Sequence, residues 1–143
     1  MKRWLVLGSM VASVCGCGVG PSPLAGQWVA TQSAFSSTDP ARAIFATSQL
    51  TISSTGDVTG DFTTIRPTNV VGERATATGT IILTTSTNAT VNLTIAFPTL
   101  GTFRVNGSAT YAAASGALGV GNATVRDASN AVVGSLAVVY QKQ

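Results

Sequence analysis

The stretch Ala89-Thr90-Val91-Asn92-Leu93-Thr94-Ile95-Ala96-Phe97 has the clearest periodicity in the chain. Its large apolar side chains occupy every second position and share one face, at Val91, Leu93, Ile95 and Phe97. The opposite face carries the polar residues Thr90, Asn92 and Thr94. A period of two residues is typical of a β-strand with one buried and one solvated face, so the stretch predicts such a strand.

The same alternation recurs along the chain and predicts about eight strands in all. The others cover residues 27–31, 49–53, 58–65, 75–85, 102–111, 117–126 and 131–141. Short segments rich in Gly, Asn, Asp and Ser separate most of them, so consecutive strands should pair antiparallel. Two connections are longer, over residues 32–47 and 67–74, and residues 38–43 of the first are typical of a capped helical turn.

A sheet of this kind has one apolar face and two exposed edges, and closing it into a barrel removes both edges. We therefore expect an all-β domain over residues 24–143, folded as an antiparallel up-and-down barrel of about eight strands. A two-sheet β-sandwich buries the same faces and stays open as the alternative.

Residues 1–17 have the features of an export leader. Lys2 and Arg3 are positively charged, an apolar stretch of about ten residues follows from Trp4, and the string Val14-Cys15-Gly16-Cys17 closes it. The apolar stretch is too short to span a bilayer. The arrangement resembles the lipobox of bacterial lipoproteins, in which the final cysteine is acylated and the chain is cut just before it.

This resemblance implies a signal peptide at residues 1–16, a lipid anchor at Cys17 and a tether over residues 17–23. In that family, Gly18 rather than an aspartate after the anchor implies the outer membrane. The partner is then the membrane itself, through the acyl chains on Cys17. An ordinary secretory signal cut near Gly18 or Gly20 is the alternative, and it also exports the chain.

Charge and residue types exclude several functions. Loss of Lys2 and Arg3 with the leader lowers the formal charge from +3 to +1, and the remaining basic residues are scattered, so nucleic acid is not an expected partner. The chain has no histidine, and both cysteines precede residue 18. We therefore expect no catalytic residue, no metal site and no cofactor.

The acidic residues do not change that expectation. Asp57 and Asp61 share a strand face but lie about 13 Å apart, beyond the separation of a glycosidase pair. We interpret Asp57 as a turn residue and Asp61 as solvated.

Two short strings indicate a barrel family. Leu24-Ala25-Gly26-Gln27-Trp28 resembles the Gly-x-Trp opening of the calycins, the group of lipocalins and avidins, and residues 56–64 resemble an avidin hairpin. The resemblance implies that Trp28 plugs one end of the barrel. Lipocalins cover this tryptophan with an arginine near the end of the last strand, where this chain has Lys142.

Three functions follow as hypotheses. The first is a non-enzymatic envelope lipoprotein whose barrel is a structural or interaction module for another envelope protein, with a threonine-rich exterior as its surface. The second is a carrier of a small apolar ligand. Its interior would be lined by Phe62, Phe97, Phe103, Tyr111 and Tyr140. The third is a protease inhibitor acting through residues 32–47, or an enzyme with unusual residues.

Overall fold

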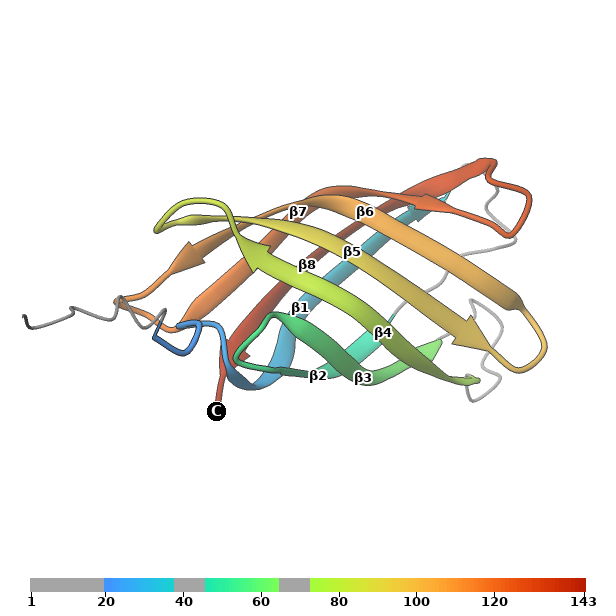
Figure 1. Cartoon of the computed structure of the whole chain (residues 1–143). Helices are drawn as coiled ribbons and strands as arrows, with labels where there is room; N and C mark the ends of the chain where they lie inside the picture. Colours follow the sequence, from blue (N-terminus) through green and yellow to red (C-terminus); the bar gives the residue numbers. More distant parts are fainter. Residues whose placement is uncertain (1–19, 38–45, 65–72) are drawn as a thin grey trace, which may run out of the picture.

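The computed structural model describes residues 20–37, 46–64 and 73–143, and these form one closed β-barrel (Figure 1). Its eight strands are β1 (Gly26–Ser37), β2 (Ala46–Ile52), β3 (Asp57–Thr64), β4 (Arg74–Leu83), β5 (Asn88–Phe97), β6 (Gly101–Ala112), β7 (Ala117–Arg126) and β8 (Val132–Lys142). Each strand pairs antiparallel with the next, and β1 also pairs with β8. The predicted antiparallel barrel is therefore confirmed, and the sandwich is not formed. No helix in the described part of the chain is long and apolar enough to cross a membrane.

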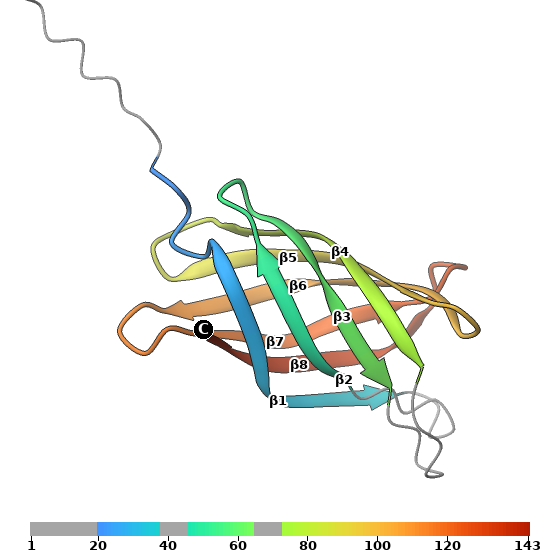
Figure 2. The same ribbon diagram turned by 90° about the horizontal axis from the view of Figure 1, so that it is seen from below.

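The pairing of β1 with β8 closes the barrel. It runs from Trp28 opposite Lys142 to Ser37 opposite Gly134, and its register shifts at a bulge between Ala30 and Gln32. Before the bulge, residues 26–29 of β1 also pair with β2. A bulge bends its strand and increases the local twist, and β1 bends sharply midway along its length (Figure 2).

The first strand is longer than the sequence predicts. The predicted strand ends at residue 31, whereas β1 continues to Ser37 because β8 supplies its hydrogen-bonding partner. Residues 32–37 contain only one large apolar side chain, Phe35, so alternation alone does not mark them as a strand. The helical turn predicted at 38–43 lies outside the described residues.

Burial follows the predicted alternation closely. In β5, every second residue from Ala89 to Phe97 is buried and the residues between them are exposed. Of the apolar side chains that alternation places inside the barrel, Leu83 is only partly buried. The others are buried: Leu50, Ile52, Val58, Phe62, Ala77, Ile81, Val91, Leu93, Ile95, Phe97, Phe103, Val105, Ala109, Tyr111, Leu136, Val138 and Tyr140.

Gly79 allows β4 and β5 to approach closely. It has a φ of +144°, which disfavours a side chain, and a Cβ atom built there would lie 2.1 Å from the carbonyl oxygen of Asn92. Gly119 in β7 differs, because a Cβ atom there would meet nothing within 4 Å.

We expect Gly79→Ala to lower the free energy of unfolding by at least about 2 kcal/mol, since it combines backbone strain with a steric clash. The control Gly119→Ala should change it by less than about 0.5 kcal/mol. Urea unfolding followed by the fluorescence of Trp28 measures both, and equal losses in the two variants would contradict the proposed close approach.

Candidate functional site

The two ends of the barrel differ. The first described residues and the C-terminus lie together at one end (Figures 1 and 2). There the backbone N–H of Gln143 donates to the carbonyl of Gln27 at 3.0 Å. We call this the plugged end. The opposite end, called the far end, carries the β5–β6 and β7–β8 turns.

Trp28 lies at the plugged end and is fully buried. Its indole N–H donates to the carbonyl of Leu24 at 2.8 Å, and the Tyr111 ring meets it edge-on at 6.2 Å between centroids. The ammonium of Lys142 lies 5.7 Å from the centroid of the indole ring and donates to the carbonyl of Pro23 at 2.8 Å. Lys142 thus covers the tryptophan where the calycin resemblance implies an arginine.

The five aromatic residues expected in a carrier's interior are all buried, but they do not form one site. Tyr111 packs on Trp28 at the plugged end, whereas Phe62, Phe97 and Phe103 lie around a small apolar cavity. Tyr140 does not line this cavity. The complete lining is Phe35, Phe62, Ile95, Phe97, Phe103, Val105, Val125 and Leu136.

This cavity has a volume of only about 20 Å³. That is room for about one water molecule, whereas pockets for small ligands usually measure about 300–1,000 Å³. Phe97 and Phe103 pack edge to face within the lining, with centroids 5.8 Å apart. Phe35 lies in a predicted connection, but its pairing with Leu136 brings it into the barrel.

A larger hollow lies on the outside, over the first three strands. It has a volume of about 350 Å³ and is lined by Gln27, Trp28, Val29, Gln49, Leu50, Thr51, Thr59, Gly60, Asp61 and Gln143. Its polar lining consists mainly of amides and hydroxyls, which can donate and accept hydrogen bonds, together with the carboxylate of Asp61. Sequence reasoning did not find this hollow, because it depends on how β1, β2 and β3 lie together.

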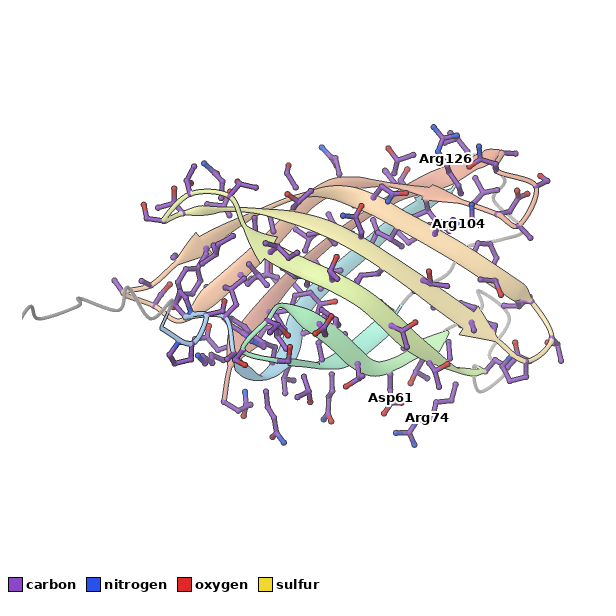
Figure 3. All side chains as sticks on the ribbon, in the orientation of Figure 1. Asp61, Arg74, Arg104 and Arg126 are labelled. Carbon is purple, nitrogen blue, oxygen red and sulfur yellow. The ribbon has the colours of Figure 1, made fainter. Side chains whose placement is uncertain are left out.

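The two aspartates considered for catalysis are engaged separately. Asp57 lies where the β2–β3 turn ends, and its carboxylate accepts from the Thr55 hydroxyl at 2.6 Å. Asp61 forms an ion pair with Arg74 on the outer face (Figure 3). The hydrogen bond from Arg74 to Asp61, together with the negative charge of Asp61, raises the pKa of the Arg74 guanidinium. Among the described residues, no group of three or more His, Cys, Asp or Glu side chains could hold a metal ion.

The outer face is rich in hydroxyl groups. One row across the sheet contains, in register, Thr51, Thr59, Thr78, Thr94, Arg104 and Arg126. On the same face, two residues further along these strands, the side-chain amide of Asn106 donates to Asn92 at 2.8 Å.

Cys17, the predicted lipid anchor, lies outside the described residues. The described chain starts at Gly20, and Leu24 is its first buried residue.

No family model matches this chain, and no curated protein does. Among solved structures, the chain is similar to a redesigned β-barrel with a TM-score of 0.57 and 16% sequence identity. The match covers 86% of this chain and 94% of that one. At this level of identity, the likeness concerns the fold alone.

We expect Lys142→Met to lower the free energy of unfolding by about 1–2 kcal/mol. The variant keeps the apolar stem over Trp28 but loses the cation–π contact and the hydrogen bond to Pro23. Lys142→Arg should stay within about 0.5 kcal/mol of the wild type, because it keeps both kinds of contact. Urea unfolding gives the stabilities, and the accessibility of Trp28 to acrylamide reports the plug. An unchanged Lys142→Met protein would mean that the lysine is dispensable for closure.

Proposed function

We propose that this chain is a non-enzymatic lipoprotein of the bacterial cell envelope, and that its calycin-like barrel acts as a structural or protein-interaction module. The observation that carries the proposal is the small volume of the cavity that the described residues enclose inside the barrel. A cavity of about 20 Å³ leaves no room for a small-molecule ligand, so recognition takes place on the outer surface.

The outer surface suits contact with another molecule. The described strands carry exposed threonine and asparagine side chains, for example Thr78, Thr94 and Asn92. Neutral hydroxyl and amide groups lose less solvation free energy on contact than charged groups do. The hollow over β1–β3 adds a concave region to this surface.

The place of the tether also supports the proposal. Residues 20–23 lead into the plugged end, next to Trp28 and Lys142. An acylated Cys17 would then hold the barrel by its plugged end, with the far end away from the point of attachment. We propose the outer membrane as that membrane, on the basis of Gly18.

Carriage of a small apolar ligand is the second candidate. The apolar lining of the cavity favours it, since Phe35, Phe62, Phe97 and Phe103 all contribute rings. A ligand would have to displace some of these rings, and their packing opposes that displacement.

Native mass spectrometry of the protein, gently extracted from its own envelope, tests the proposed module. We expect a defined assembly with another envelope protein and no small-molecule adduct. A reproducible adduct on the monomer would overturn the proposal in favour of a carrier. A monomer with neither adduct nor partner would also count against an interaction module.

The anchor is tested separately by the mass of the mature N-terminal peptide. We expect cleavage before Cys17 and a mass increase equal to several acyl chains, because one chain alone binds a membrane only marginally. The variant Cys17→Ser should lose the acyl chains and leave the membrane fraction. Cleavage near Gly18 or Gly20 without acylation would show an ordinary secreted protein.

A further inference from the structure

Two arginines lie directly opposite each other on the outer face near the far end. Arg104 in β6 is the register partner of Arg126 in β7, and their neighbours Val105 and Val125 point into the core. Figure 3 shows both side chains on the outside of these two strands. The Cβ atoms of opposed residues in an antiparallel pair are about 4.5–5.5 Å apart, and like charges placed so are destabilising.

No described carboxylate side chain relieves this repulsion by pairing with Arg104. Asp57 is held in its turn, and Asp61 pairs with Arg74. Glu73 accepts the backbone N–H groups of Thr99 and Leu100, at 2.8 and 3.3 Å.

Asp127 is also engaged, because it accepts the backbone N–H groups of Ser129 and Ala131, at 2.9 and 3.0 Å. Arg126 donates to the carbonyl of Asn130 at 3.0 Å, and Arg104 has no hydrogen bond or ion pair to another described residue. The fold therefore places two arginines at opposed positions of neighbouring strands, with few of their donors bound to other described residues.

The positive charge and hydrogen-bond donors of the two arginines favour binding of an anion. Each guanidinium is planar and always charged, and its forked donors match the oxygens of a phosphate or a carboxylate. Thr94, the register partner of Arg104 in β5, is exposed and adds a hydroxyl donor beside the pair.

The pair lies on an exposed strand surface, where a single small anion gains little binding energy. A polymer that presents anionic groups in series would gain more from repeated contact.

The pair lies away from the end of the barrel at which the described chain begins. From Arg104 to the end of β6 the strand runs about 26 Å, or about 20 Å along the axis of a barrel with tilted strands. The tether enters at the opposite end. This separation is at least twice the distance over which physiological salt screens charge, so lipid headgroups at the plugged end would act only weakly on the pair.

We propose that Arg104 and Arg126 form a docking site for an anionic polymer of the cell envelope, whose phosphate or carboxylate groups bind across the two guanidinium groups. The inference rests on the proposed function in one respect, the anchoring that places the site away from the membrane. The barrel would then link the membrane at its plugged end to the polymer at its far end.

The test uses the mature full-length protein in neutral detergent, with inorganic polyphosphate and polyglutamate as separate polymer probes. We expect the wild type to bind at least one polymer, and Arg104→Gln/Arg126→Gln to bind it at least about tenfold more weakly. Which polymer binds distinguishes phosphate from carboxylate recognition. Inorganic phosphate alone and vesicles of phosphatidylglycerol are the comparison ligands.

Arg74→Gln is the matched control for Arg104→Gln. Both remove one positive charge from the same half of the barrel, but Arg74 is already paired with Asp61. We expect Arg104→Gln to weaken polymer binding about fivefold and Arg74→Gln less than twofold. The urea midpoint of Arg104→Gln should equal or exceed that of the wild type, because the variant removes a like-charge contact.

Three results would overturn the inference: no binding of either polymer, an equal loss in Arg74→Gln and Arg104→Gln, or binding to the vesicles without binding to the polymers. The anchor is assessed independently by the mass of the N-terminal peptide. Arginine-dependent binding by a protein without acyl chains would support the proposed site and contradict the proposed link to the membrane. An acylated protein that binds no polymer would support the proposed anchor and contradict the proposed site.

Discussion

The pairing of β1 with β8 is the constraint on which the rest of this structure depends. It joins segments about a hundred residues apart and gives every strand two neighbours, which closes the sheet into a barrel. The approach is close, since a Cβ atom on Gly134 would lie 2.4 Å from the carbonyl oxygen of Ser36. The bulge between Ala30 and Gln32 bends β1 so that its first part can also pair with β2.

Closure decides what the interior can do. An eight-stranded barrel has space for its own inward side chains or for one small ligand, and the described aromatic side chains leave a cavity of only about 20 Å³ between them. Trp28 and Tyr111 occupy the plugged end, and a group of phenylalanines around Phe62 occupies the region of the cavity. The larger hollow lies outside, over β1–β3.

The contacts of each charged residue depend on its position on the closed barrel. Lys142 covers the tryptophan plug beside the tether, whereas Arg104 and Arg126 lie together toward the other end. A chain with few charges thus has cations in two different roles, one that stabilises the fold and one that leaves donors available. The contrast with Arg74, which is paired with Asp61, makes the second role testable.

The sequence by itself determined the strands, their antiparallel order and the buried face of each, because alternation and short polar turns are local features of residues such as those of β5. It also marked Trp28 by resemblance. Only the tertiary structure decided between the predicted closed barrel and the sandwich, and showed that β1 extends to Ser37 and that Phe35 joins the core. The tertiary structure also decided that Arg104 and Arg126 lie opposite each other on neighbouring strands. These features depend on register between strands, and register is set by partners that no local pattern contains.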